Sequence, residues 1–283
     1  MTTGIDDNIE KHERIATQYD ERHPEIYNAI EQSRLSESLS YVRSLMHTDR
    51  PKALDYGCGT GNVTQHLLSL GFEVEAADVT PKFVAIVNER FADTGQISGR
   101  ILNGVDLQGC PGDHFDAVTV YSVLHHIPDY VGALRDIERV IKPGGVLFLD
   151  HEFAPGHWDP NEELLSLRAQ TKVRPSISSY ARRLLSPDWY IRRYRKMLNP
   201  RYQPEGDIHV WPDDHIDWDL IRTSLEYAMD VDRVTDYLYY QAHYPVAVFN
   251  EYKLQCSDLR EMILRKHSKQ GSFNEGSLRQ LTQ

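Results

Sequence analysis

The amino-acid sequence predicts an α/β fold: a doubly wound, mostly parallel seven-stranded sheet with an antiparallel edge hairpin and a helical cap. One observation is the alternation of short apolar runs with amphipathic segments between residues 50 and 151, which is typical of parallel β-α-β units. A second is a glycine-rich turn directly after the first apolar run. The third is that the alternation stops after residue 151, where we expect antiparallel strands and added helices.

The first 48 residues are polar, with apolar side chains at mostly helical spacings, and we expect an N-terminal helical cap segment there. Pro51 separates this segment from the predicted core. In the core, Thr80 followed by Pro81 marks the start of one helix. The expected strands are residues 53–56, 73–78, 100–104, 115–121 and 146–150, and the expected helices lie around 63–68, 81–91 and 131–141.

Beyond the fifth strand, residues up to about 212 are rich in Arg, Tyr, Trp and Pro and do not alternate. We then expect a helix over 216–229 and two strands, 235–241 and 246–253, as the edge hairpin. The predicted division is an N-terminal cap segment at 1–48, a ligand-binding core at 49–151, a cap insertion over the active site at 152–213, the end of the core at 214–256, and a C-terminal helix and tail at 257–283.

Composition restricts the class of protein. The chain has 283 residues, a formal net charge of −11, 40 % hydrophobic residues and 26 % charged residues. This is an ordinary globular composition, and its acidity argues against a nucleic-acid binder, which needs a basic surface. Three distant cysteines, Cys58, Cys110 and Cys256, give neither a disulfide framework nor a metal-ligand spacing. We expect a cytoplasmic protein without a secretory signal or membrane span, because no apolar run approaches roughly 20 residues.

The strongest chemical signal is the segment 55–61, Asp-Tyr-Gly-Cys-Gly-Thr-Gly, which joins a predicted strand to a predicted helix. Glycines let a ligand approach the backbone, and the N–H groups at a helix start suit an anionic group. The spacing G-x-G-x-G, with no Lys-Ser or Lys-Thr after it, excludes a P-loop. Asp78 closes the second strand, 21 residues beyond Gly57, where a carboxylate can accept hydrogen bonds from two ribose hydroxyls. That carboxylate alone would serve a nicotinamide dinucleotide equally well.

A series of segments makes the sequence resemble the class I S-adenosylmethionine-dependent methyltransferases, particularly the small-molecule group that includes the ubiquinone- and menaquinone-biosynthesis type. The matching segments, in order, are ALDYGCGTG at 53–61, Asp78, Asp106 in NGVDL, FDAVTVYSVLHHIPD at 115–129, and the KPGG turn before VLFLD. The resemblance implies the Rossmann-like methyltransferase fold, with S-adenosyl-L-methionine as the cofactor bound by the 49–151 core.

The resemblance also implies roles for individual residues. The glycines of the 55–61 turn would line the methionine and ribose parts of the donor, and Asp78 would hold the ribose hydroxyls. Asp106 would sit beside the adenine amino group, with Val105 or Leu107 packed on the ring, and Tyr19 would close over the donor. The cofactor-binding residues expected in this way are Tyr19, Asp55, Gly57, Cys58, Gly59, Gly61, Asp78, Val79, Asp106, Leu107, Tyr121 and Ser122.

Methyl transfer from a sulfonium demands mainly alignment and desolvation, worth on the order of 7–11 kcal/mol. A general base is needed only when the acceptor is protonated. The candidates are His125 and His126 after the fourth strand and His151 and Glu152 after the fifth, because open α/β sheets bind ligands at these strand ends. His125 is the favoured catalytic residue. A structural role stays open for the other three: His126 could tie its loop to the backbone, and His151 and Glu152 could form a solvated strand end.

Between residues 168 and 202 the chain is basic and aromatic, and residues 205–236 are acidic. Three interpretations stay open: a cap whose charges pair with the acidic stretch within the fold or in a homodimer, a cap that binds a carboxylated or phosphorylated acceptor, and peripheral membrane contact through residues 180–198. The histidines and aspartates between 209 and 217 fit no metal-ligand spacing, so we expect no metal.

The sequence therefore predicts an enzyme that moves a methyl group to an oxygen, nitrogen or carbon of a small molecule by in-line displacement. One alternative is a methyltransferase acting on RNA or protein, against which the acidic total and the lack of a recognition domain argue. A catalytically silent nucleotide-binding module is another, because donor binding and turnover share most residues. A nicotinamide-dependent oxidoreductase is disfavoured by the glycine spacing and by Asp106.

Overall fold

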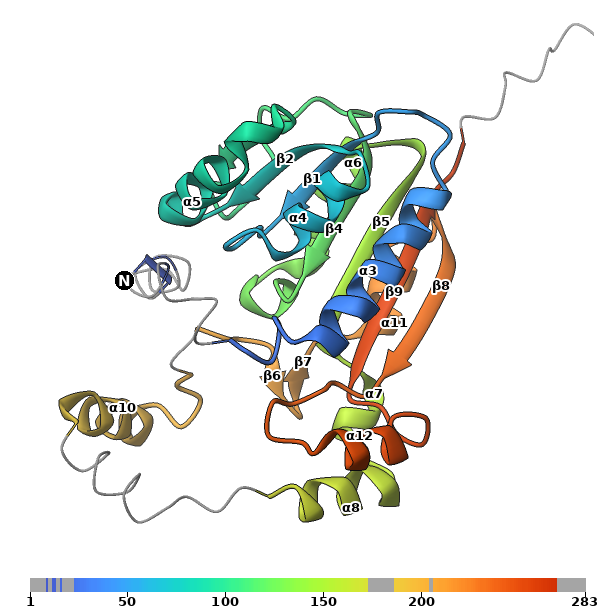
Figure 1. The fold of residues 1–283 in the computed structure, drawn as a ribbon. Helices are drawn as coiled ribbons and strands as arrows, with labels where there is room; N and C mark the ends of the chain where they lie inside the picture. The colour runs from blue at the N-terminus through green and yellow to red at the C-terminus, as the bar shows by residue number, and fades with distance from the viewer. Residues whose placement is uncertain are drawn as a thin grey trace, which may run out of the picture.

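The computed structural model describes Ile9, His12, Glu13, Ala16 and residues 23–172, 186–203 and 206–268. Figure 1 shows one twisted sheet with helices on both of its faces. Several predictions lie outside the described residues: the role of Tyr19, the conformation of residues 180–185 and the tail after residue 272.

The sheet has seven strands in the spatial order β3-β2-β1-β4-β5-β9-β8 (Figure 1). Strands β1 to β5 run parallel, whereas β9 is antiparallel to both β5 and β8. The strand order reverses between β1 and β4, and open sheets bind ligands beside the carboxyl ends at such a point. The predicted fold class is confirmed. The strands are β1 Lys52–Tyr56, β2 Glu73–Asp78, β3 Ile97–Ile101, β4 Phe115–Tyr121, β5 Ile141–Phe153, β8 Met229–Tyr237 and β9 Leu259–Lys266.

Helices cover both faces because β1, β4 and β5 are buried along most of their length. On one face, Leu39 of α3 and Leu67 of α4 belong to the core cluster that includes β-strand residues. Helix α5 lies against β2 and β3 on this same face, because Ile97 packs both on its cluster and on the cluster of α3 and α4. On the other face, Leu134 of α6 and Ile221 of α11 belong to a second core cluster that includes β-strand residues. The helices are α3 Ala29–Ser44, α4 Asn62–Ser69, α5 Pro81–Phe91, α6 Tyr130–Val140, α7 Pro155–Trp158, α8 Glu162–Gln170, α10 Pro187–Leu198, α11 Trp218–Leu225 and α12 Val246–Tyr252.

Helix α3 differs from the expected cap segment at 1–48. Its residues Leu35 and Leu39 are almost completely buried in the sheet core. The helix is also tied to β5 by an ion pair, since Nη1 of Arg34 lies 3.0 Å from Oδ2 of the buried Asp150. This part of the N-terminal region therefore belongs to the core of the fold.

The predicted edge hairpin exists, but its second strand lies later in the chain. Residues 246–253, expected as a strand, form helix α12 instead, and β8 pairs with β9, where we expected a C-terminal helix within 257–283. The sequence VAVFNEYK resembles a strand because its apolar residues partly alternate. Phe249 and Tyr252, three positions apart, are buried in a cluster with residues of α8, so packing on another helix decides the conformation.

Two other boundaries differ from the prediction. The strand expected at 100–104 is β3, which begins at Ile97. The helix expected at 216–229 ends at Leu225, and Met229 already begins β8. Both shifts fall at segment ends, which periodicity defines poorly.

The predicted cap insertion at 152–213 occupies two places. Helices α7 and α8 follow the carboxyl end of β5, and α8 packs on α12 (Figure 1). Residues 206–215 return to the sheet, where the N–H groups of Ile208 and His209 donate to the carbonyl oxygen of His125 over 2.9 and 3.1 Å. Two short strands, β6 Val210–Trp211 and β7 Asp214–His215, form this returning segment.

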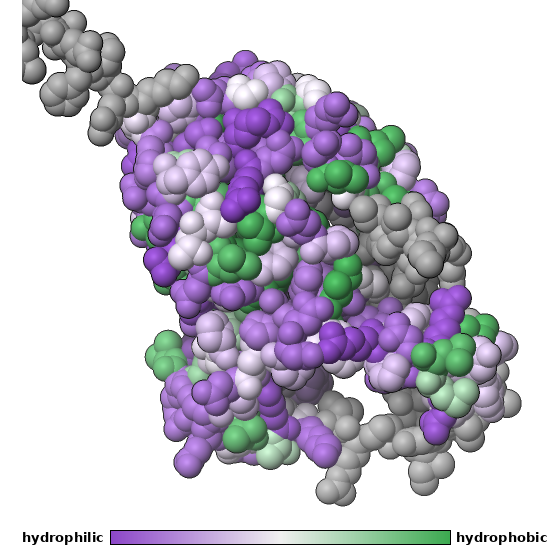
Figure 2. Space-filling model, turned by 180° about the vertical axis from the view of Figure 1, so that it is seen from behind, coloured by the Kyte–Doolittle hydropathy of each residue, from purple (hydrophilic) through white to green (hydrophobic). Residues whose placement is uncertain are grey.

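Helix α10 presents both basic and apolar side chains to solvent. Arg192 and Arg193 are exposed, as are Tyr194 and Met197. Figure 2 shows hydrophobic side chains among hydrophilic ones on the projecting part of the molecule that contains this helix. Peripheral membrane contact through 180–198 stays a prediction. Among the described residues, no helix is both long and apolar enough to cross a membrane.

Candidate active site

The glycine turn between β1 and α4 forms one wall of the site. Gly57, Gly59 and Gly61 all have positive φ angles, of 78°, 50° and 96°, a conformation that glycine adopts without steric cost. A Cβ atom on Gly57 would lie only 2.3 Å from a methyl carbon of Val123. The N–H groups of Gly57 and Cys58 donate to the carbonyl oxygen of Ala77, over 2.8 and 3.0 Å, which holds the turn against the end of β2.

Asp78, at the end of β2, is joined to the same turn. Its Oδ2 accepts a hydrogen bond of 3.0 Å from the N–H of Gly59, and its Oδ1 accepts one of 2.8 Å from the N–H of Thr80. Burial raises the pKa of the Asp78 carboxyl above its usual value, although these two N–H groups act in the opposite direction. The carboxylate thus lies at a fixed position where each oxygen can accept a further hydrogen bond.

Asp55 lies deeper, at the carboxyl end of β1. Its side chain is buried and accepts hydrogen bonds from the hydroxyls of Thr64, over 2.6 Å, and Thr119, over 3.1 Å. Desolvation raises the pKa of Asp55 to about 6, against the effect of the two hydroxyl groups. The fold therefore holds a carboxyl group below the glycine turn, and this group ionises at about pH 6.

These residues line one cavity, which we name the donor cavity. Most of the cofactor residues expected from the sequence are among its lining: Asp55, Gly57, Cys58, Gly59, Asp78, Val79, Tyr121 and Ser122. Gly61 adjoins it as the residue before α4. Sequence reasoning missed Ile26, Tyr27, Phe83 and Ile127, which also line it. Their positions follow from packing between distant segments: the hydroxyl of Tyr27, for example, lies 2.7 Å from that of Thr60.

Asp106 and Leu107 are not part of that lining. Asp106 is exposed, and its Oδ1 accepts a hydrogen bond of 2.8 Å from the side-chain amide of Asn103. Leu107 is buried in the sheet core. The cavity is lined instead by Leu102 and Gly104 of the same loop. The adenine contact of Asp106 stays a prediction that this conformation of the loop does not support.

A second cavity adjoins the first, and we name it the acceptor cavity. Four residues line both: His12, Ile26, Ser122 and His126. Its lining includes six histidines, which are His12, His23, His125, His126, His151 and His157. Arg168 and three carboxyl groups, those of Glu25, Asp207 and Asp258, also line it. The structure thus brings three of the four predicted catalytic residues, His125, His126 and His151, to one cavity.

Glu152, the fourth predicted catalytic residue, orients His125. Its Oε2 lies 2.8 Å from Nδ1 of His125, and its Oε1 accepts a hydrogen bond of 2.8 Å from the N–H of Leu124. Because a carboxylate only accepts, Nδ1 is the protonated nitrogen and a neutral ring carries its lone pair on Nε2. Glu152 is almost completely buried, so the solvated strand end considered for it is wrong.

His151 packs against two aromatic rings and lines the acceptor cavity. It stacks on Tyr121, with ring centroids 4.8 Å apart, and meets the ring of Tyr239 edge-on at 4.6 Å. Its φ angle is 65°, a strained conformation for a residue with a Cβ. Burial lowers the pKa of His151 to about 3, so the ring is neutral at physiological pH. Among the described residues, neither Nε2 of His151 nor the hydroxyl of Tyr239 has a hydrogen-bond partner.

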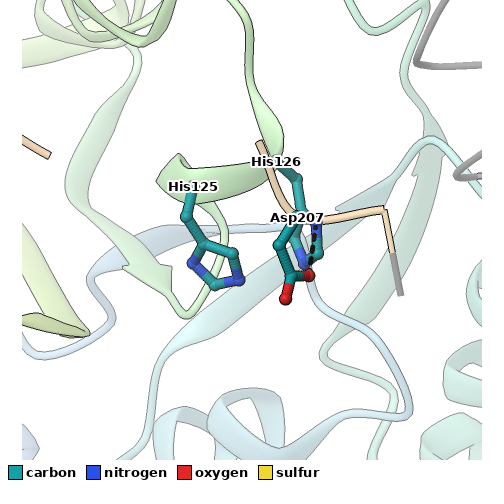
Figure 3. Close-up of side chains that lie close together, drawn as sticks. All are labelled: His125, His126 and Asp207. Carbon is teal, nitrogen blue, oxygen red and sulfur yellow. Dashed lines mark ion pairs between the residues drawn. The ribbon is translucent and has the colours of Figure 1, made fainter. Parts of the chain in front are cut away.

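His126 faces an acidic residue from the cap insertion. Its Nδ1 lies 3.5 Å from Oδ1 of Asp207, and its ring centroid is 4.2 Å from that of His125 (Figure 3). One ligand atom from each of these three residues lies within 4.8 Å of the other two. No pattern in the sequence pointed to Asp207, because it is far from the histidines in the chain.

The histidine and aspartate pattern at 209–217 is structural. His209 connects Oδ1 of Asp214, at 2.5 Å, to the carbonyl oxygen of Ile127, at 3.1 Å. Asp217 caps α11 by accepting a hydrogen bond from the N–H of Leu220. Arg201 forms ion pairs with Asp213 and Asp214, so basic and acidic stretches do meet within the fold at this point.

Comparison with known proteins agrees with this geometry. Residues 54–149 match a family model described as a methyltransferase domain. The ubiquinone biosynthesis O-methyltransferase of Xanthomonas axonopodis pv. citri (strain 306) is 34 % identical over 112 residues, which make up 39 % of this chain and 47 % of that protein. The chain thus spans about half the length of the curated relatives it matches. The predicted resemblance to class I methyltransferases is confirmed over this part of the chain.

Solved structures share the fold. The N-methyltransferase NodS from Bradyrhizobium japonicum WM9, in complex with S-adenosyl-L-homocysteine, aligns with a TM-score of 0.57 at 16 % identity, over 92 % of this chain and 99 % of that chain. The cyclase SpnF aligns with a TM-score of 0.50 at 16 % identity, over 82 % of this chain and 81 % of that chain. At such identities only the fold is shared, and a cyclase among these structures means that the fold does not fix the reaction.

Proposed function

We propose that the protein is an S-adenosylmethionine-dependent methyltransferase that acts on a small, oxygen-bearing molecule. The observation that carries this proposal is the meeting of two cavities at Ser122 and His126. One cavity has the glycine turn and the carboxylate that suit a nucleoside with an amino-acid tail. The other is lined by polar groups suited to a second substrate.

In the donor cavity, each part of S-adenosylmethionine has a matching group. The ribose hydroxyls would donate to Asp78, whose oxygens are already positioned by Gly59 and Thr80. The methionine end would lie over the glycine turn, with its α-ammonium group toward Asp55, which would attract it as an ionised carboxylate. Phe83 and Leu102 offer apolar contacts to the adenine.

The reaction is an in-line displacement. The acceptor atom forms a bond to the methyl carbon while the carbon–sulfur bond breaks, and its electron pair stays on the sulfur of S-adenosylhomocysteine. A hydroxyl acceptor must also lose its proton, and His125, held by Glu152, is the residue we assign to acceptor activation. We assign residues 206–215 and α8 a capping role, which would keep water from the sulfonium.

The charges of the acceptor cavity favour a neutral acceptor. Arg168 is its single arginine or lysine among the described residues, whereas three carboxyl groups, those of Glu25, Asp207 and Asp258, line the same cavity. A carboxylated or phosphorylated acceptor would therefore meet more negative than positive charge. The uncharged polar atoms of His151 and Tyr239 suit a hydroxyl or carbonyl oxygen better.

The test begins with donor binding. Calorimetry of the purified protein with S-adenosylhomocysteine should show one site, and Asp78→Ala should abolish it. The protein is then incubated with methyl-labelled S-adenosylmethionine and cell extract, and the label is followed into small-molecule, lipid, protein and RNA fractions. Asp78-dependent label in small molecules supports the proposal. Label in protein or RNA contradicts the acceptor class, and failure to bind the donor contradicts the whole assignment.

A further inference from the structure

We propose that His125, His126 and Asp207 bind one divalent transition-metal ion at the junction of the two cavities. Two imidazoles and a carboxylate form a donor set that suits zinc, iron, cobalt or nickel better than magnesium or calcium. The three side chains come from the turn after β4 and from the returning part of the insertion, and Figure 3 shows them facing one another.

The distances match a site that closes around an ion. Ligands about 2.0–2.2 Å from a tetrahedral zinc lie about 3.3–3.6 Å apart. Nδ1 of His126 and Oδ1 of Asp207 already have that spacing, at 3.5 Å, which is long for a direct hydrogen bond. The three ligand atoms lie within 4.8 Å of one another. Side-chain rotations that move each atom by about an ångström would bring all three to one ion.

Glu152 supplies the support that a metal-binding histidine needs. Histidine ligands commonly donate their second N–H to a carboxylate, which fixes the ring and increases its basicity. Oε2 of Glu152 accepts from Nδ1 of His125 at 2.8 Å and is itself held through Oε1 by the N–H of Leu124. The coordinating nitrogen of His125 is therefore Nε2.

The backbone holds the third ligand, Asp207, close to the two histidines. The carbonyl oxygen of His125 accepts hydrogen bonds from the N–H groups of Ile208 and His209, directly after Asp207 in the chain. The segment that carries Asp207 is thus attached to the turn that carries both histidines. All three side chains are partly buried, with 15 to 21 % exposure, so the ligands are fixed while one side of the ion faces the acceptor cavity.

This placement gives the ion a chemical role, and that role rests on the proposed function. An acceptor hydroxyl bound to the ion would have a lowered pKa and would lose its proton to solvent. With the ion bound, His125 would therefore activate the acceptor as a metal ligand and not as a general base. Its oxygen would then attack the methyl carbon as a metal-bound alkoxide or phenolate. Because His126 lines both cavities, the bound oxygen would lie on the side facing the donor. This proposal replaces the expectation, drawn from sequence spacing, that no metal is bound.

The experiment measures metal binding directly. Full-length protein is stripped with a chelator and titrated with Co²⁺, and visible d–d absorption reports coordination by nitrogen and oxygen ligands. We expect one equivalent, displaced by Zn²⁺. Asp207→Asn and His126→Asn should weaken Co²⁺ binding by more than about 100-fold, and Glu152→Gln by about 10- to 100-fold. Circular dichroism checks that each variant is folded.

Asp214→Asn is the matched control, because Asp214 also pairs with a histidine, His209, in the same insertion. It should leave Co²⁺ affinity unchanged. No Co²⁺ site in the native protein, or equal binding by Asp207→Asn, overturns the proposal.

S-adenosylhomocysteine binding, measured on the same samples, separates the two proposals. A metal-free protein that binds this nucleoside but not Co²⁺ contradicts only the metal site. Metal binding without nucleoside binding contradicts the methyltransferase assignment and leaves the metal site intact.

Discussion

The imidazole of His151 lies almost face to face with the phenol ring of Tyr121, with centroids 4.8 Å apart and planes inclined by 29°. The ring of Tyr239 also meets that of His151 edge-on, so the orientation of the imidazole is held by contacts with two aromatic rings. Its Nε2 is directed by packing, and not by a hydrogen bond, among the described residues. Such a buried polar atom costs free energy unless something else satisfies it, which favours a role in binding the acceptor.

The substitution His151→Phe tests that role. A phenyl ring keeps the stacking on Tyr121 and removes Nε2. The free energy of unfolding, measured with urea, should therefore stay the same or rise by about 1 kcal/mol. Methyl transfer at low acceptor concentration should fall at least tenfold, or about 1.4 kcal/mol, while donor affinity stays unchanged. Tyr239→Phe, which removes the neighbouring hydroxyl, should behave in the same way. If both variants transfer the methyl group as fast as the native chain, these two polar groups bind buried water and not the acceptor.

Asp78 and Asp106 give opposite expectations for donor binding. Asp78→Ala removes the hydrogen-bond acceptor of the Gly59 and Thr80 N–H groups together with the ribose acceptor, so the affinity for S-adenosylhomocysteine should fall at least 100-fold, about 2.7 kcal/mol. Asp106→Ala should change it by less than about threefold, because Asp106 is exposed outside the cavity. Calorimetry measures both. A large loss in the Asp106 variant would show that its loop moves to the adenine on binding.

Gly57 and Gly59 form a second matched pair. Both have positive φ angles, so alanine at either position costs roughly 1 kcal/mol of backbone strain. At Gly57 the new Cβ would also meet Val123 at 2.3 Å, whereas at Gly59 nothing lies within 4 Å among the described residues. Gly57→Ala should therefore lower the urea midpoint clearly more than Gly59→Ala. Equal losses would mean that Val123 moves aside without cost.

The buried carboxyl of Asp55 predicts a pH dependence with a definite sign. Its pKa is about 6 in the folded protein and near its ordinary value of about 3.9 when unfolded. The folded state thus binds the proton more readily, and its stability should fall, by up to about 3 kcal/mol, as the pH rises from about 4 to 6.

The measurement is urea unfolding at several pH values for the native chain and for Asp55→Asn. Burial raises the pKa of Asp258 to about 6 as well, so the contribution of Asp55 is the difference between the two proteins. S-adenosylmethionine, which carries a positive charge, should bind to the native chain more tightly above pH 6 than below it. Its affinity for Asp55→Asn should not show this increase. Identical pH profiles would contradict the assignment.

Local patterns in the sequence define the core of the fold. The apolar runs that become β1, β4 and β5, the glycine turn and the position of Asp78 all depend on neighbours within a few residues. The positions of His125 and His151 at strand ends follow from the same alternation. These features could be predicted because a buried parallel strand must be apolar and its end must turn.

Features that depend on distant segments could not be predicted. Asp207 meets His126 only because residues 206–215 return to the sheet, and no periodicity describes that path. Residues 246–253 alternate like a strand, yet Phe249 and Tyr252 are buried with α8 in a helix. Asp106 fits the family pattern, but its loop turns the carboxylate toward Asn103.

Strand β9 lies between β5 and β8 although it follows both in the chain. During synthesis, β8 would therefore emerge from the ribosome with no strand to pair with, since its only neighbour in the sheet is not yet made. The exposed edge of β5 would stay open for the same interval. A released chain truncated just before residue 259 should hold its first five strands in native order while β8 remains unpaired and available to chaperones.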